Sequence, residues 1–276
     1  MKAAIEKMPM SEMEKLMRYS NRNILLNACV GLERYKKAFG CIPYTILDMG
    51  AHIGGLTLQA MEQGVPCILA VEADGRNYKH LIENVNRQTE RIGYEGHVEC
   101  LHRAFCDTTG DIVEIIGVGN EMSNTGQRSM FYSKSAKKVQ RGYTVRHTKT
   151  INIDGIVEKL ESFGVYTIDL FKCDIEGAEF TAMPMNSRTR EFFSHIKYVD
   201  IELHPWTNGD YYNTESFFKL HKEFDDTKRI VFQYFEFLRD CGFCVPDDIL
   251  NTEHEYLKLT TFNKALCGEA KEGVML

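Results

Sequence analysis

The sequence contains no long hydrophobic run, and we do not expect a secretory signal. A helix that crosses a bilayer needs roughly 18 or more consecutive apolar residues, and the chain of 276 residues has no such stretch. Its first residues also lack the succession of basic, apolar and small residues that marks a signal peptide. We therefore expect a cytoplasmic protein with no membrane span.

Paired cysteine motifs are scarce, although the chain has nine cysteines. The C-x-x-C formed by Cys241 and Cys244 has neither a second such pair nor a pair of histidines nearby, so zinc is not predicted there. Cys67, Cys100 and Cys173 fall on predicted buried strands, where a free thiol behaves as a small hydrophobic side chain. Scattered cysteines in odd number are typical of a reducing compartment, in keeping with a cytoplasmic location.

The chain also lacks the positive net charge of a general nucleic-acid binder, since its formal charge is −6. The charge is uneven, however: no Asp or Glu occurs from Met122 to Ile153, and that span is rich in Lys and Arg. We name residues 120–150 the basic flap. Two interpretations stay open, a solvated hairpin or a segment that binds an anionic ligand; its Phe131 and Tyr143 leave a nucleotide conceivable.

Length and composition are those of one globular domain. With 43% hydrophobic and 26% charged residues, the chain can bury a full core. We expect an N-terminal helical extension at 1–43 and one domain at 44–276, in which strands alternate with helices. This order predicts an α/β fold with a mainly parallel sheet that binds ligands at the carboxyl ends of its strands. Strands are expected at 45–49, 67–72, 97–102, 144–153, 167–173 and 198–203, with a closing antiparallel pair at 242–245 and 255–261. Helices are expected at 54–63, 75–91, 154–163, 213–223 and 227–241.

The most informative segment is the glycine-rich stretch TILDMGAHIGG, residues 45–55. A strand that ends in glycines and turns into a helix lets a ligand approach the backbone and the helix N-terminus. The G-x-G-x-x-G fingerprint of NAD enzymes fails because His52 stands at its middle glycine, and a P-loop fails because no lysine follows Gly55. An ordinary turn between a strand and a helix is the alternative interpretation.

Acidic residues near these glycines favour a cationic ligand over a phosphate-bearing one. Asp48 begins the pattern D-x-G-x-x-x-G, and Glu72 ends the next strand, where ribose hydroxyls are held in dinucleotide-type folds. A carboxylate beside the loop repels a pyrophosphate but suits an ammonium group. S-adenosylmethionine (SAM) carries an ammonium, a sulfonium and a ribose but no phosphate, so the sequence predicts a SAM site.

Seven segments follow one another in a characteristic order: LDMGAHIGGLTL (47–58), AVEAD (70–74), LIENVN (81–86), RAFCDTTGD (103–111), INIDGIV (151–157), IDLFKCDIEGAEF (168–180) and VDIELHP (199–205). In order and spacing they resemble the FkbM-type SAM-dependent methyltransferases, and K-x-D-x-E-G-x-E is the most specific element. The resemblance implies a class I methyltransferase Rossmann-like fold, with a mostly parallel seven-stranded sheet and helices on both faces. It also implies O-methylation of a hydroxyl on a small molecule, sugar or glycan. This acceptor molecule could be anionic. The basic flap and residues 1–43 depart from the family pattern.

The resemblance further implies which residues contact SAM, and these are Asp48, Gly50, Ala51, His52, Gly54, Thr57, Glu72, Ala73, Ala104, Phe105 and Asp174. Catalysis of methyl transfer requires a nucleophile held in line and a group that removes its proton. We expect His204 to be this general base, Asp174 to orient the acceptor hydroxyl or the SAM amino group, and Glu176 to hold a second hydroxyl or orient His204. For Glu179 and Glu202 a structural role and a catalytic role are both open.

A metal site and the role of one lysine also stay open. Asp174, Glu202 and His204 could give an O,O,N ligand set for Mg²⁺ or a softer divalent ion, although the resemblance does not require a metal. Lys172 lies two residues before Asp174, on the same side of the predicted strand. It either neutralises the acids or reaches the sheet surface beneath a helix.

Two other functions remain as hypotheses. The basic flap suggests a methyltransferase that acts on a nucleotide or nucleic acid, but the Asn/Asp-Pro-Pro-aromatic loop usual for base nitrogens is missing. A non-catalytic SAM-binding subunit is the third hypothesis, and the acids around residues 174–179 disfavour it. The acceptor is not predicted, because the walls that select it vary without disturbing the cofactor site.

Overall fold

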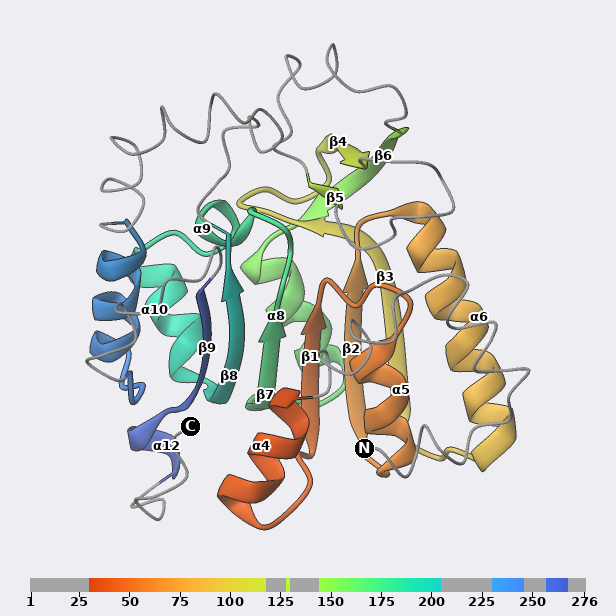
Figure 1. The fold of residues 1–276 in the computed structure, drawn as a ribbon, viewed down its shortest axis with the longest axis horizontal. Helices are drawn as coiled ribbons and strands as arrows, with labels where there is room; N and C mark the ends of the chain where they lie inside the picture. The colour runs from red at the N-terminus through yellow and green to blue at the C-terminus, as the bar shows by residue number, and fades with distance from the viewer. Residues whose placement is uncertain (1–29, 118–127, 130–143, 205–229, 246–256, 268–276) are drawn as a thin grey trace.

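A computed structural model describes residues 30–117, 128–129, 144–204, 230–245 and 257–267. Within these ranges nine strands form one sheet in the order β5-β4-β6-β3-β2-β1-β7-β8-β9 (Figure 1). The strands are β1 (Thr45–Met49), β2 (Cys67–Glu72), β3 (His97–Phe105), β4 (Ile112–Gly117), β5 (Arg128–Ser129), β6 (Thr144–Ile151), β7 (Ile168–Cys173), β8 (Ile196–Leu203) and β9 (Leu257–Phe262). Of the N-terminal helical extension expected at 1–43, residues 1–29 lie outside the described residues, as do most of the basic flap and the helix expected at 213–223.

The sheet is mostly parallel, as predicted. Strands β6, β3, β2, β1, β7 and β8 pair in parallel, whereas β9 runs antiparallel to β8 and β4 runs antiparallel to β6. The Rossmann-like fold class is therefore confirmed, but the expected count of seven strands is too low. The additional strands β4 and β5 form an antiparallel edge next to β6, and β5 falls within the basic flap.

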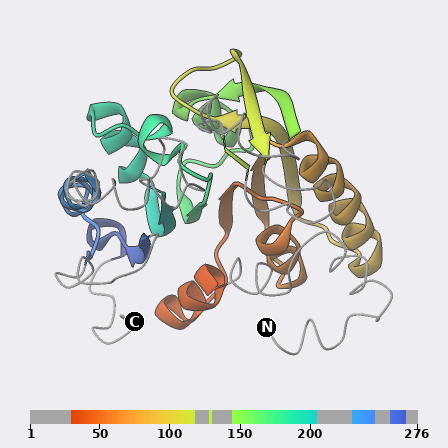
Figure 2. The same cartoon turned by 45° about the horizontal axis from the view of Figure 1, so that its top comes forward.

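Helices cover both faces of the sheet (Figures 1 and 2). One face carries α4 (Val30–Phe39), α5 (Gly55–Glu62) and α6 (Gly75–Ile92). The other carries α8 (Ile153–Ser162), α10 (Ser187–Ser194) and the helix over residues 230–240. Two single-turn helices, α9 (Glu179–Ala182) and α12 (Lys264–Cys267), complete the described elements.

Successive residues of the central strands point to opposite faces, so each strand contributes to two cores. Ile46 and Leu170 pack in the core beneath α4, α5 and α6, whereas Leu47 and Phe171 pack in the core beneath α8 and α10. All residues of β1, β2 and β7 are buried. Burial on both faces explains why these strands have near-continuous apolar sequences rather than alternating ones.

The C-terminal end of the sheet differs from the prediction. The expected strand at 242–245 is absent from the described structure, where only an isolated bridge joins Phe243 to Asn263. Gly242 has a φ of 96° and its N–H donates to the carbonyl of Arg239, so the chain here closes the preceding helix instead of extending. Strand β9 was predicted at 255–261 and is confirmed at 257–262 as the antiparallel neighbour of β8.

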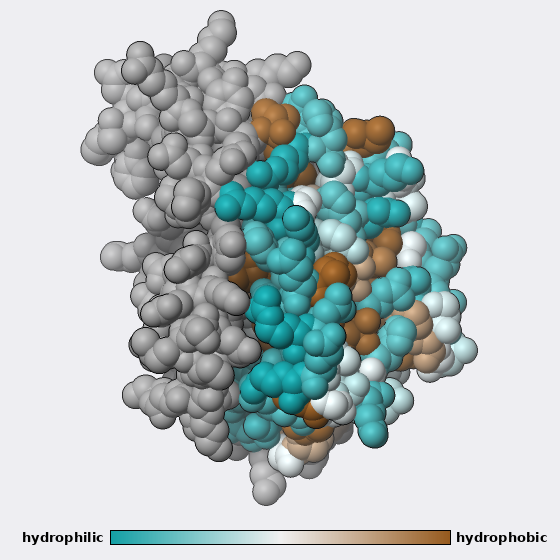
Figure 3. Space-filling view, turned by 90° about the vertical axis from the view of Figure 1, so that its right-hand side faces the viewer, coloured by the Kyte–Doolittle hydropathy of each residue, from teal (hydrophilic) through white to brown (hydrophobic). Residues whose placement is uncertain are grey.

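The outer surface follows the amphipathic pattern of the helices. Helix α6 buries Leu81 and Val85 against α5 and the sheet. The face of the molecule that carries α6 is covered mainly by hydrophilic side chains, with apolar ones scattered between them (Figure 3). No helix within the described ranges is both long and apolar enough to cross a membrane.

Candidate functional site

The predicted glycine loop, Asp48–Gly55, connects β1 to α5 at the carboxyl edge of the sheet. The N–H groups of Gly50 and Ala51 both donate to the carbonyl of Val71, each over 2.9 Å, which fixes the loop to β2. Gly50 has a φ of 75°, and a Cβ built on it would lie 1.9 Å from the carbonyl oxygen of Asp174. The loop thus contacts the end of β7 backbone to backbone, an approach that only glycine permits.

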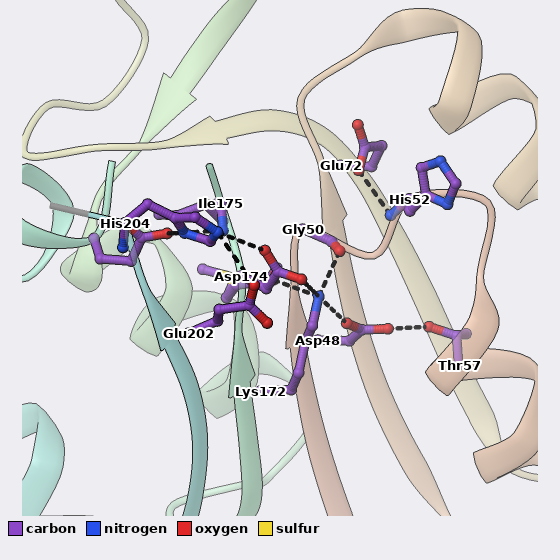
Figure 4. A network of polar contacts seen from close by, with 12 residues as sticks. Asp48, Gly50, His52, Thr57, Glu72, Lys172, Asp174, Ile175, Glu202 and His204 are labelled. Atoms are coloured by element: carbon purple, nitrogen blue, oxygen red, sulfur yellow. Dashed lines mark hydrogen bonds and ion pairs between the residues drawn. The ribbon is translucent and has the colours of Figure 1, made fainter. Parts of the chain in front are cut away.

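The carboxylate of Asp48 is 1% exposed and is held by protein groups (Figure 4). One oxygen accepts a hydrogen bond of 2.8 Å from the Thr57 hydroxyl, and the other lies 3.7 Å from Nζ of Lys172. Burial raises the pKa of Asp48, and Lys172 and Thr57 offset only part of that rise. Asp48 therefore connects the start of the loop to α5 through Thr57 and to β7 through Lys172.

Glu72 ends β2 and holds the loop from the other side. Its carboxylate accepts hydrogen bonds from the backbone N–H of His52 over 2.7 Å and from that of Asp74 over 2.8 Å. Burial raises the pKa of Glu72 to about 7 despite these bonds. His52 adopts a φ of 55°, which is uncommon for a residue other than glycine and marks a backbone constrained by its surroundings.

A buried carboxylate at the start of α6 is bound by an arginine of β6. Asp74, which is fully buried, caps α6 by accepting from the N–H groups of Arg76 and Asn77. Arg146 of β6 donates to both oxygens of the same carboxylate over 2.7 and 2.8 Å. The sequence analysis did not identify this pair, since only the fold brings residues 74 and 146 together.

Three predicted cofactor residues lie at the ends of the neighbouring strands β2 and β3. The carbonyl of Ala73 lies 3.1 Å from Nε2 of His102, while Ala104 and Phe105 end β3 and are 2% and 3% exposed. They reach the same edge of the sheet as the glycine loop because β1, β2 and β3 are parallel neighbours. Gly54, with a φ of 100°, completes the loop as the residue before α5.

An acid cluster with one histidine gathers at the ends of β7 and β8, which are adjacent and parallel (Figure 4). Nε2 of His204 lies 3.3 Å from a carboxylate oxygen of Glu202 and 3.9 Å from one of Asp174. Nδ1 lies 3.0 Å from Oε1 of Glu179. The fold thus brings the predicted residues Asp174 and His204 together, and Glu202 lies beside them.

Glu179, rather than Glu176, holds His204. It is fully buried, and its oxygens accept hydrogen bonds from the N–H groups of Ile175, Gly177 and His204. Because an ionised carboxylate only accepts hydrogen bonds, Nδ1 of His204 carries a proton and Nε2 faces Asp174 and Glu202. The K-x-D-x-E-G-x-E spacing was the only sequence signal for this role, since the first turn of a helix gave an equally good explanation of Glu179.

The acids control the charge of His204. Burial lowers its pKa, but the hydrogen bond and charge of Glu179, together with Glu202 and Asp174, raise it well above the ordinary value. Burial, followed by the charge of Asp174, raises the pKa of Glu176 to about 8. In the protein alone, these shifts favour the imidazolium form of His204 and the protonated form of Glu176 near neutral pH.

Three of these side chains could hold a divalent ion. Asp174, Glu202 and His204 each offer one ligand atom, and the three atoms lie within 4.8 Å of one another. Carboxylate oxygens and an imidazole suit Mg²⁺, Mn²⁺ or a softer divalent ion. The N–H of His204 that points to buried Glu179 resembles the arrangement that orients metal-bound histidines.

Comparison with known families agrees with this arrangement. The mostly parallel sheet with helices on both faces is a Rossmann-like fold of the methyltransferase class, and the family model described as the methyltransferase FkbM domain matches residues 48–244. The chain belongs to the FkbM methyltransferase family. No curated protein matches its sequence significantly.

Solved methyltransferase structures are similar only at low identity. A chain of the fibrillarin/Nop5p complex is 14% identical, with a TM-score of 0.40 over 79% of this chain and 72% of that chain. M. capricolum TrmK with S-adenosyl-homocysteine (SAH) is 10% identical, with a TM-score of 0.36 over 84% of this chain and 66% of that chain. The METTL16 methyltransferase domain is 12% identical, with a TM-score of 0.31 over 75% and 73%. Scores this low carry no argument about substrate.

Proposed function

We propose that this protein is a SAM-dependent O-methyltransferase that acts on a hydroxyl of a small molecule, sugar or glycan in the cytoplasm. The observation that carries the proposal is the convergence of two groups at one edge of the sheet. The glycine loop with Glu72 lies at the ends of β1 and β2, and the His204–Glu179 pair lies with Asp174 at the ends of β7 and β8. A methyl donor in the first group would present its sulfonium to the second.

The donor site follows from the contacts of the loop. Glu72 would accept hydrogen bonds from the ribose hydroxyls while it keeps the N–H of His52. Gly50, Ala51 and Gly54 let the donor approach the backbone, and Ala73, Ala104 and Phe105 would face the adenine. Asp48 and Thr57 act through the loop rather than on the donor, because their polar atoms bind each other.

The acceptor hydroxyl would lose its proton to Nε2 of His204. In the transfer step the hydroxyl oxygen forms a bond to the methyl carbon, the carbon–sulfur bond breaks, and the proton moves to His204. A sulfonium near the cluster disfavours the imidazolium, so donor binding lowers the His204 pKa and frees Nε2 to accept the proton. Asp174 and Glu176 would orient the acceptor.

A divalent ion is a second candidate for activating the hydroxyl, favoured by the closeness of Asp174, Glu202 and His204. A bound cation would lower the pKa of the hydroxyl directly. Treatment with EDTA distinguishes the two: transfer that depends on His204 alone persists, whereas transfer through an ion is lost and returns with Mn²⁺.

The proposal is tested with methyl-labelled SAM, fractionated cell extract and mass analysis of the labelled product. Wild-type protein should label a hydroxyl-bearing compound, and His204→Ala should lower the rate by about a hundredfold or more while SAM still binds. His195→Ala, an exposed histidine at the end of α10, is the matched control and should label as wild type does. SAM binding without transfer would contradict an enzyme and favour a non-catalytic subunit, and labelled RNA would contradict the acceptor class.

A further inference from the structure

We propose that Lys172 is a positioning residue that holds the glycine loop in the shape that receives the methyl donor. Its side chain comes from β7, is 8% exposed and points along the sheet to the loop (Figure 4). The ammonium donates to the carbonyl of Gly50 over 2.7 Å and to that of Met49 over 3.2 Å. These contacts decide between the two roles that the sequence left open for Lys172.

The register of the sheet places the ammonium between acids. Lys172 pairs with Asp48 of β1 on one side and with Asp200 of β8 on the other, so the three side chains share one face. Nζ lies 3.7 Å from a carboxylate oxygen of Asp48 and 3.9 Å from one of Asp174. Burial lowers the pKa of Lys172, but Asp174 and Asp48 more than offset this, so the side chain keeps its charge.

The donors of the ammonium account for its effect on the loop. A lysine offers three N–H groups; two are directed to loop carbonyls, and the third faces the carboxylates of Asp48 and Asp174. Without Lys172, the carbonyls of Gly50 and Met49 would lose the ammonium as a donor, although Met49 would keep the N–H of Asp174, and the two carboxylates would face each other without a cation. The loop would then lose its side-chain bonds to β7 beside Gly50, and the backbone bond from Asp174 to Met49 would remain there.

Hydrogen exchange on the protein without donor tests this inference independently of any ligand. In wild type the amides of Gly50 and Ala51 are held by the carbonyl of Val71. We expect Lys172→Met to speed exchange in peptides that cover residues 49–55 by about tenfold or more, because two hydrogen bonds from a charged donor are lost. Exchange in α6 and α8 should stay as in wild type.

Lys197→Met is the matched control. Lys197 also bridges strands, since its Nζ lies 2.7 Å from Asp169 of β7, but it does so at the opposite, amino edge of the sheet. This variant should leave exchange over residues 49–55 unchanged. If Lys172→Met does not fold, Lys172→Arg keeps the charge but moves the donors, and it should speed exchange in the same peptides. Wild-type exchange there in the folded Lys172 variants would overturn the inference.

Donor titration links the inference to the proposed function, on which it rests for its ligand but not for its geometry. Lys172→Met should raise the dissociation constants of SAM and of SAH by the same factor, about tenfold or more, because the loop receives both. Tighter SAM binding with unchanged SAH binding would show that the ammonium repels the sulfonium instead, and would contradict positioning. If wild type binds neither ligand, the proposed function fails, and the exchange result still judges Lys172.

Discussion

At the scale of single residues, His204 owes its chemistry to the three acids that surround its ring. Glu179 accepts hydrogen bonds from three backbone N–H groups and is fully buried, so its carboxylate is fixed beside Nδ1 of His204. Glu202 and Asp174 face the other ring nitrogen. Glu179 therefore orients the imidazole ring, while Glu202 and Asp174 help to raise its pKa.

Replacing Glu179 with Gln should change both properties. Because Glu179 contributes most to the raised pKa of His204, Glu179→Gln should move the rise of the pH–rate profile to lower pH. The maximal rate should fall by about tenfold to a hundredfold, since Nδ1 loses a charged acceptor. Methyl transfer measured across pH checks both effects. Glu158→Gln, on the exposed side of α8, should leave the profile in place; a profile that stays put in Glu179→Gln would count against the His204 mechanism.

At the scale of elements, the pair between Arg146 and Asp74 joins strand β6 to the first turn of α6. Arg146→Met would leave the buried carboxylate of Asp74 without its cation and should cost about 3 kcal/mol of unfolding free energy. Thermal or urea unfolding measures this loss. Arg188→Met, whose partner Asp154 is 65% exposed, should cost less than about 1 kcal/mol. Equal losses in the two variants would show that the pair with Asp74 is an ordinary surface contact.

The central elements and the edge strand β9 could be predicted from the sequence, whereas the edge strands β4 and β5 could not. Strands β1, β2 and β7 are short, mostly apolar runs bounded by turn residues, because burial on both faces favours apolar side chains. Among their few polar residues, Asp48, Glu72 and Lys172 lie near the strand ends that form the site. Helix α10 was missed although Asn186 caps it by accepting from the N–H of Thr189, a local signal that was available. The bond between Glu179 and His204 joins residues 25 apart in the chain, and no local pattern specifies such a contact.

At the scale of the whole molecule, the site is built at a cost in stability that depends on pH. The pKa of Glu176 rises from 4.5 to about 8 on folding, so the folded protein holds this proton more tightly than the unfolded chain. The resulting stabilisation is complete below pH 4.5 and is lost as the pH rises towards about 8. Glu72, with a pKa raised to about 7, adds a loss of the same sign.

Glu176→Gln should therefore gain stability relative to wild type as the pH rises. We expect the difference in melting temperature, variant minus wild type, to grow between about pH 5 and pH 9 by a few degrees, on the order of 1 kcal/mol or more. Thermal unfolding at several pH values measures it. A difference that shrinks over this range would show that the Glu176 carboxyl is not held protonated by burial and by Asp174.

The central claim is that the loop above β1 and β2 receives a sulfonium donor rather than a diphosphate. Calorimetric titration of the purified protein with SAM and, separately, with NAD⁺ tests it most directly. The account predicts saturable binding of SAM that Glu72→Ala abolishes, and no binding of NAD⁺. Saturable binding of NAD⁺, or SAM binding that Glu72→Ala leaves intact, would contradict it.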